Sequence, residues 1–216
     1  SFHHNGVESN AYFINGLNRF EISANASLTH YKFQKESSKA YQVTNGGITQ
    51  ERDSTFTSHV IDAGGRIVRN NLNTELKGSG TQTNYNGIYY AKGESHIDNQ
   101  TFIDHAVPHC ESNELYKGIL DDHGVGVFNG KVLVRQDAQK TNAYQQNSSL
   151  VLSQTATMNA KPQLEIFADD VRCSHGATIG QLDEQSIFYL KSRGVPESDA
   201  RKLLQHAFLG EVIEQI

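Results

Sequence analysis

The chain has 216 residues, 37% of them hydrophobic, and its 24 acidic residues outnumber 19 Lys and Arg to give a formal charge of -5. Duplex binding depends on clustered Lys and Arg that neutralise phosphates, so this mildly acidic composition argues against a nucleic-acid partner. No apolar run approaches the roughly 20 residues that span a bilayer, so we expect no membrane partner. With 10 Phe and 9 Tyr, the chain is too rich in aromatic residues to be disordered.

Two sequence features bear on the cellular compartment of the protein. The amino-terminal residues show no basic segment followed by an apolar one, which predicts that there is no secretory signal peptide. Cys110 and Cys173 are the two cysteines, too few for a disulfide-stapled scaffold. We therefore expect a cytoplasmic protein with free thiols. Because the sequence begins at Ser1 rather than Met, we interpret it as a processed chain or a fragment.

Short segments in which apolar and polar residues alternate fill the chain from about residue 10 to residue 179. Such alternation predicts strands with one buried and one exposed face. The clearest of these segments are residues 19–23, 41–44, 66–69, 126–128 and 131–134. Asn and Gly tolerate the left-handed backbone of tight turns. We therefore expect turns at the Asn- and Gly-rich residues 45–47, 70–71, 86–87 and 129–130.

Many short strands without an intervening helix are typical of a sandwich, a barrel, a jelly roll or a solenoid. Polar residues at strand positions and the lack of Pro-bounded hairpins favour the solenoid. A Gly-x-apolar element also recurs, beginning at Gly65, Gly87 and Gly118. Its spacing is irregular and falls short of a clean repeat. The pattern alone leaves a β-helix and the other β folds about equally favoured.

The carboxyl-terminal part is helical in pattern. Asp183 can cap a helix that ends at Gly194, and Pro196 suits the first turn of a second helix. Apolar residues recur at helical spacing in the second helix: Leu203, Leu204, Ala207, Phe208 and Val212. This stripe either caps the open end of the β core or docks a partner. We expect a β core over residues 1–180 and a small helical domain over residues 181–216.

Cys173 and His175 are the first candidate site. They lie two residues apart in a segment that we expect to be a strand, so both side chains project from one face. A thiolate beside an imidazole suits Fe, Cu(I) or Zn. Two ligands are too few for a closed metal site, which needs others from elsewhere in the chain or from a partner. The pattern alone favours a structural role for the pair.

His105, His109 and Cys110 form a second candidate. Pro108 argues against a helix, and on an extended strand His105 and His109 share a face while Cys110 points the other way. A metal would find two histidines at best, so a structural role is again favoured.

Paired carboxylates at residues 121–122 and 169–170 could suggest the sugar chemistry that is common on β-helices. Glycoside cleavage needs two carboxyl groups that face each other across roughly 5–9.5 Å. Adjacent strand residues point to opposite faces, so we interpret both pairs as solvated turn residues.

The run KPQLEIFADDVRCSHGATIGQLD at residues 161–183 closely resembles the signature of the SufB/SufD family of iron–sulfur cluster assembly proteins. The match continues through residues 188–194, and residues 27–31 and 128–130 are also similar to the family, so the resemblance covers nearly the whole chain. Within the family, the Cys-Ser-His-Gly-Ala-Thr run resembles the SufD branch; SufB members tend to carry Cys-Glu-His-Glu-Ala.

The resemblance implies a mainly β protein, a right-handed parallel β-helix followed by a small helical carboxyl-terminal domain. It also implies an amino-terminal helical region, which we expect this sequence to lack. The implied function is that of a non-catalytic scaffold subunit in an ATPase-driven assembly complex. In the family, the β-helices of SufB and SufD pair, and each subunit binds a SufC ATPase through its carboxyl-terminal helices.

The resemblance also assigns site residues. His175, and less strongly Cys173, is implied as a ligand of iron or a nascent Fe–S cluster at the interface with SufB. We expect no tightly bound cofactor in the isolated chain, in which a homodimer through the same β-helix edge stays open. The helical residues that we expect to contact SufC are Phe188, Tyr189, Arg193, Leu203 and Phe208.

Two other classes of function remain open. A secreted β-helix enzyme acting on polysaccharides would need facing carboxylates and usually a secretion signal. A stand-alone metal-binding homodimer would bind metal as the isolated chain and lose it on His175→Ala.

Overall fold

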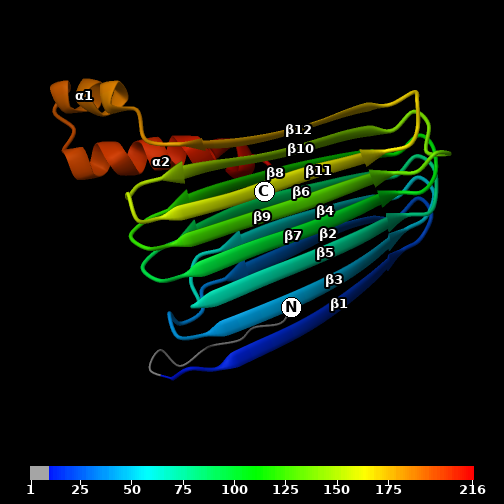
Figure 1. Cartoon of the computed structure of the whole chain (residues 1–216), viewed down its shortest axis with the longest axis horizontal. Helices are drawn as coiled ribbons and strands as arrows, with labels where there is room; N and C mark the ends of the chain where they lie inside the picture. Colours follow the sequence, from blue (N-terminus) through cyan, green and yellow to red (C-terminus); the bar gives the residue numbers. More distant parts are fainter. Residues whose placement is uncertain (1–9) are drawn as a thin grey trace.

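The computed structural model describes residues 10–216, so the first nine residues of the expected β core lie outside it (Figure 1). The described residues form twelve strands and two carboxyl-terminal helices. The strands are β1 Phe13–Ile22, β2 Ser27–Gln34, β3 Tyr41–Gln50, β4 Thr55–Asp62, β5 Ile67–Leu76, β6 Gln82–Ala91, β7 His96–His105, β8 Glu111–Leu120, β9 Val125–Val134, β10 Asn142–Val151, β11 Thr157–Ile166 and β12 Arg172–Gly180. The helices are α1 Glu184–Ser192 and α2 Glu197–Ile213.

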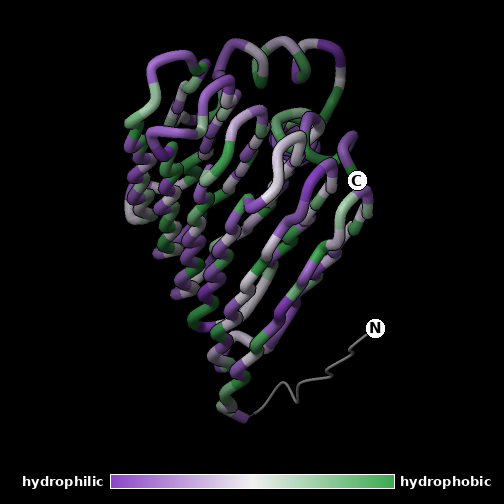
Figure 2. Tube along the Cα trace, turned by 90° about the vertical axis from the view of Figure 1, so that its right-hand side faces the viewer, coloured by the Kyte–Doolittle hydropathy of each residue, from purple (hydrophilic) through white to green (hydrophobic). Residues whose placement is uncertain are grey.

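The strands alternate between two six-stranded sheets, one in the order β1-β3-β5-β7-β9-β11 and the other β12-β10-β8-β6-β4-β2. All pairings are parallel. Tyr41 pairs with Ile67, 26 residues later, whereas Val125 pairs with Thr157, 32 residues later. The chain is therefore a parallel β-helix, as predicted, and its unequal coils hide any clean sequence repeat. Hydrophilic and hydrophobic residues alternate along its strands (Figure 2).

The prediction of turns at the Asn- and Gly-rich segments is wrong, because those residues lie inside β3, β5, β6 and β9. The two segments predicted as separate strands at 126–134 are likewise one strand, β9. On the outer face of the odd-numbered sheet, amide side chains stack between coils. Asn71 Nδ2 donates to Asn45 Oδ1 over 2.8 Å, and Asn129 Nδ2 donates to Gln100 Oε1 over 2.9 Å. Asn thus contributes side-chain hydrogen bonds to the strands rather than turns.

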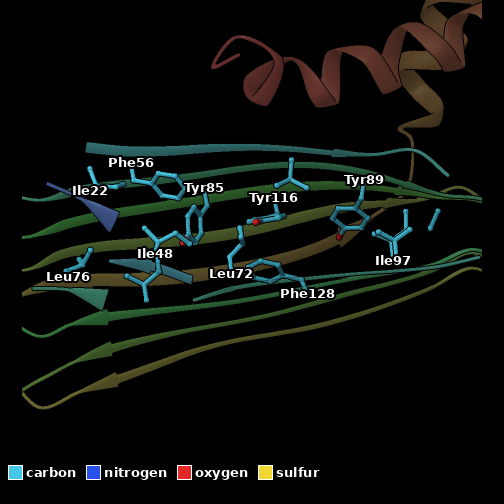
Figure 3. Close-up of a cluster of buried hydrophobic side chains, with 14 of the residues drawn as sticks. Ile22, Ile48, Phe56, Leu72, Leu76, Tyr85, Tyr89, Ile97, Tyr116 and Phe128 are labelled. Carbon is cyan, nitrogen blue, oxygen red and sulfur yellow. The ribbon is translucent and has the colours of Figure 1, made fainter. Parts of the chain in front are cut away.

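Two of the recurrent glycines make room for tyrosine rings. Gly87 pairs with Tyr116, and Tyr89 pairs with Gly118, on the inner face of β6 and β8. A Cβ atom on Gly87 would lie 2.1 Å from Tyr116 Cδ1, and one on Gly118 would lie 2.2 Å from Tyr89 Cε2. Both rings are buried between the sheets (Figure 3). Gly65 differs, because it lies in a turn with a φ of 84°.

The five corners that join β1, β3, β5, β7 and β9 to the next even-numbered strand share a left-handed residue. These residues, with φ between 57° and 77°, are Asn25, Asp53, Gly80, His109 and Lys140. Neighbouring corners hydrogen-bond to one another, as where the backbone N–H of His109 donates to the carbonyl of Gln139 over 2.9 Å. Lys140 is unusual in a left-handed conformation, and no Asn or Gly marks the corners at His109 and Lys140, so sequence pattern alone did not reveal them.

The residues at the helix boundaries predicted the positions of both helices correctly. The carboxylate of Asp183 accepts hydrogen bonds from the backbone N–H groups of Gln185 and Ser186 at the start of α1. Gly194 follows α1 with a φ of 87°, and Pro196 directly precedes α2. A side-chain cap at the first turn and glycine after the last are common helix boundaries.

One buried lysine holds α2 against the outer face of the even-numbered sheet. Lys117 Nζ, in β8, donates to the carbonyl of Phe208 over 2.8 Å and lies 2.7 Å from Glu211 Oε2. It also lies 5.1 Å from the centroid of the Phe208 ring. Because α2 contacts β8 and β6, it packs on the side of the sheet away from the core (Figure 3). It does not cap the end of the β-helix, which was one interpretation of its apolar stripe.

The packing of glycine against tyrosine predicts a specific loss of stability. Gly87→Ala forces a methyl group into the buried Tyr116 ring, so we expect the free energy of unfolding to fall by about 1–3 kcal/mol. Gly47→Ala is the matched control, since no atom lies within 4 Å of a Cβ there. Urea denaturation of both variants checks this, and equal stabilities would contradict the packing described.

Candidate functional site

Cys173 and His175 lie in β12, the strand that ends the even-numbered sheet, and so occupy a strand as predicted. Cys173 pairs with Ala143 and His175 pairs with Gln145 in β10. Both partners are buried between the sheets. Because residues two apart share a face, Cys173 and His175 belong to the inner face of the last coil.

The two side chains differ in their surroundings. Cys173 is half-buried and packs against a small apolar cluster that includes Ala143 and Ala168. Burial raises the pKa of its thiol above the ordinary value, and a backbone hydrogen bond at Ala143 opposes this only partly. His175 is exposed. The imidazole is thus accessible to a partner, whereas the thiol must lose its proton before it can bind a metal, and burial opposes that loss.

A buried polar column lies beside this face, one and two strands inward. Glu114 in β8 accepts hydrogen bonds from Thr101 Oγ1 over 2.5 Å and from Gln145 Nε2 over 3.1 Å. Burial raises the pKa of Glu114 to about 7, although both hydrogen bonds lower it. Sequence analysis missed these residues. The sequence holds one signal for them: Ser112 and Glu114 are polar, although both occupy inward-facing positions of β8. That signal can be recognised only when the strand register is known.

The end of the β-helix that carries β12 is open. β11 and β12 each have a single neighbouring strand within their sheets. Met158 and Leu164, on the inner face of β11, are only half-buried. Ile179 in β12 is 56% exposed, and Phe167, just after β11, is 64% exposed. Unpaired strand edges and exposed apolar side chains together are typical of a surface that another chain covers.

Within residues 10–216, no group of three or more His, Cys, Asp or Glu side chains is placed to hold a metal ion. Cys173 and His175 therefore remain a pair. Any closed site at this end needs ligands from outside the described chain.

The second candidate set is dispersed by the fold. His105 ends β7, and its Nε2 lies 2.9 Å from Ser112 Oγ. Burial lowers the pKa of His105 to about 4. His109 lies at a corner rather than on the same strand, which corrects the expectation that the two histidines share a strand face. Cys110 is buried, and its Sγ lies 3.5 Å from the carbonyl oxygen of Gly78. His105 and Cys110 are thus part of the buried core, and His109 is part of a corner between strands.

The acidic pairs are turn residues, as predicted. Residues 121–122 lie in the corner between β8 and β9, where Asp122 has a φ of 54°. Residues 169–170 lie between β11 and β12 and are exposed.

The helices present a second exposed surface. Phe188 and Tyr189 in α1 are 73% and 57% exposed, and Leu203 in α2 is 52% exposed. The Arg193 guanidinium lies 5.2 Å from the centroid of the Tyr189 ring. Phe208 differs from these residues, because it is half-buried against Lys117. Neither helix of the described residues is long and apolar enough to cross a membrane.

Comparison with known proteins agrees with this architecture. The family described as "SUF system FeS cluster assembly, SufBD core domain" matches residues 1–208. An iron–sulfur cluster assembly SufBD family protein of Synechocystis sp. is 40% identical over 95% of this chain and 45% of its own length. The iron–sulfur cluster assembly protein SufD of Escherichia coli is 36% identical over 95% of this chain and 48% of its own. SufD of Bacillus subtilis is 32% identical over 89% and 44%.

The chain thus spans about half the length of the relatives that it matches. The family match includes every strand of the β-helix, the Cys173–His175 pair and most of α2. The chain belongs to the SufBD core family of the SUF system for iron–sulfur cluster assembly.

Proposed function

We propose that this chain is a SufD-type scaffold subunit, without catalytic activity of its own, in a Suf iron–sulfur cluster assembly complex. The observation that carries the proposal is the place of Cys173 and His175, on the last strand of an open β-helix. Two soft ligands there are incomplete alone. A partner that covers this end completes them and holds the iron or the nascent cluster at the interface.

His175 is the principal ligand in this proposal. Its exposed imidazole can bind through a ring nitrogen, and imidazole suits iron. Cys173 is the weaker candidate, because burial raises its thiol pKa and favours the protonated form. An incomplete donor set suits a scaffold, since iron or a cluster is cargo that must later leave. A closed four-ligand site would tend to retain it.

The partner at the open end is a SufB-type subunit. Free strand edges pair readily with strands of another chain, and β11 and β12 present such edges. Pairing there would also cover Phe167 and Ile179, which are largely exposed in the single chain. A second copy of this chain would use the same edge, so the homodimer competes with the heterodimer.

The helices, which we treat as a separate domain over residues 181–216, bind a SufC-type ATPase. Their exposed Phe188, Tyr189 and Leu203 supply the aromatic and apolar contacts that dominate many interfaces. Phe208 and Lys117 tie α2 to β8. Movement of the ATPase would therefore pass through α2 to the even-numbered sheet, which carries the Cys173–His175 pair.

Replacing His175 tests the site directly. In the complex purified with SufB-type and SufC-type partners, we expect His175→Ala to lose most of its iron and acid-labile sulfide while the three subunits still purify together. The physical reason is the loss of the imidazole ligand, because within residues 10–216 no group of three or more His, Cys, Asp or Glu side chains offers a substitute. His123→Ala is the control, because His123 is exposed in the corner before β9. Unchanged iron and sulfide in His175→Ala would contradict the proposed role.

Replacing Phe188 tests the helical surface. Truncation of a central interface aromatic typically costs about 2 kcal/mol, so we expect Phe188→Ala to weaken SufC-type binding about 30-fold. Phe33→Ala is the control, since Phe33 in β2 is 70% exposed and lies outside the helices. Calorimetric titration with the ATPase measures both affinities. Equal binding by the two variants would show that Phe188 does not contribute to the interface.

A further inference from the structure

A buried amide next to His175 has an unused acceptor. Gln145 is 3% exposed, and its Nε2 donates to Glu114 Oε1 over 3.1 Å. Its Oε1 is buried and has no hydrogen-bond partner within the described chain. A buried polar atom without a partner costs free energy, and in native structures it is rare enough to suggest a function.

Packing and hydrogen bonding restrict the orientation of this amide. A Cβ atom on Gly130, across the core in β9, would lie 2.2 Å from Gln145 Nε2, so a larger residue there would displace the amide from its present position. Glu114 also accepts a hydrogen bond from Thr101 Oγ1. A carboxylate that accepts the amide N–H leaves the amide oxygen as the end available to another donor.

His175 is the neighbour that can supply this donor. It is the register partner of Gln145 on β12, and both belong to the inner face of the even-numbered sheet. Neighbouring strands lie about 4.8 Å apart, so paired side chains on one face are within hydrogen-bond reach. The other neighbour of Gln145 in the sheet is Glu114, which its Nε2 already engages.

In the single chain no ring nitrogen of His175 bonds this acceptor. We propose that Gln145 positions His175 when a partner covers the open end and the ring turns inward: Oε1 then accepts a hydrogen bond from one ring N–H and leaves the second ring nitrogen free for the metal. This inference rests on the ligand role of His175 proposed above. In metal sites a ligating histidine almost always donates its other ring N–H to an oxygen, which fixes the tautomer and orients the ring. Gln145 is thus a positioning residue, supported in turn by Glu114 and Gly130.

The test replaces the amide of Gln145 with an apolar group of similar size. Gln145→Met removes the acceptor, and Gln50→Met is the matched control. Gln50 in β3 is also fully buried, and its side chain bonds Ser54 and Thr83 rather than anything near β12. Both variants lose an internal amide, so a merely structural effect should appear equally in the two.

The first readout needs no metal. Nitrogen-15 labelling of histidine reports the tautomer of each ring, and the His175→Ala spectrum assigns the signals of His175. In the iron-free complex with the SufB-type partner, we expect one tautomer and a slowly exchanging ring proton for the unsubstituted chain and for Gln50→Met. In Gln145→Met we expect a mixture of tautomers and rapid exchange of that proton. The same His175 signals in Gln145→Met as in Gln50→Met would overturn the proposal.

The second readout is iron retained by the complex with the SufB-type partner during dialysis against a chelator. Loss of an outer-shell partner typically weakens metal binding about 10–100-fold, and we expect that loss for Gln145→Met alone. If Gln145→Met does not fold, Gln145→Asn serves instead, because its shorter amide cannot reach the ring. A changed tautomer with unchanged iron would overturn the positioning role.

The two proposals fail separately. If His175→Ala keeps its iron, the ligand role fails whatever the tautomer shows. If His175→Ala loses iron but Gln145→Met matches Gln50→Met in both readouts, only the role of Gln145 fails.

Discussion

The last coil of a parallel β-helix has no further coil with which its strands can form backbone hydrogen bonds. The candidate site follows from this constraint. Each strand pairs only with strands of the coils on either side, so the final coil leaves a free edge and a half-covered inner face. The contrast is visible between register partners. Ala143 and Gln145 are buried in β10, whereas Cys173 is half-buried and His175 is exposed in β12. The same inner-face positions that build the core elsewhere become accessible ligands at this end.

The interior changes character toward that end. In the middle coils, aromatic rings fill the space between the sheets, as where the Tyr116 and Phe128 centroids lie 5.0 Å apart (Figure 3). On β10 the inward residues are instead mostly polar, among them Gln145 and Asn147. A purely apolar filling would be simpler to stabilise, because a buried carboxyl group such as Glu114 costs free energy when charged. This cost is consistent with the positioning role proposed for Gln145, which Glu114 supports.

Sequence reasoning succeeded where the signals are local. The Asp183 cap, Gly194 and Pro196 lie within the segments whose structure they determine. It failed at residues 70–71 and 86–87, because Asn71 there bonds an amide of the neighbouring coil and Gly87 makes room for a tyrosine ring, both inside strands rather than in turns. The candidate ligands were found through a run of consecutive residues. Gln145 and its partners were not, since only the register of three distant strands brings them together.

The central claim is that the open end of the β-helix is the assembly interface. Backbone hydrogen exchange tests it most directly, because the outer edge of β12 has no pairing strand in the single chain and its amides should exchange rapidly. On binding a SufB-type subunit, we expect protection concentrated in β11 and β12, with β2 and β4 unchanged. Unchanged exchange in β12, with protection elsewhere in the chain, would contradict this placement of the interface.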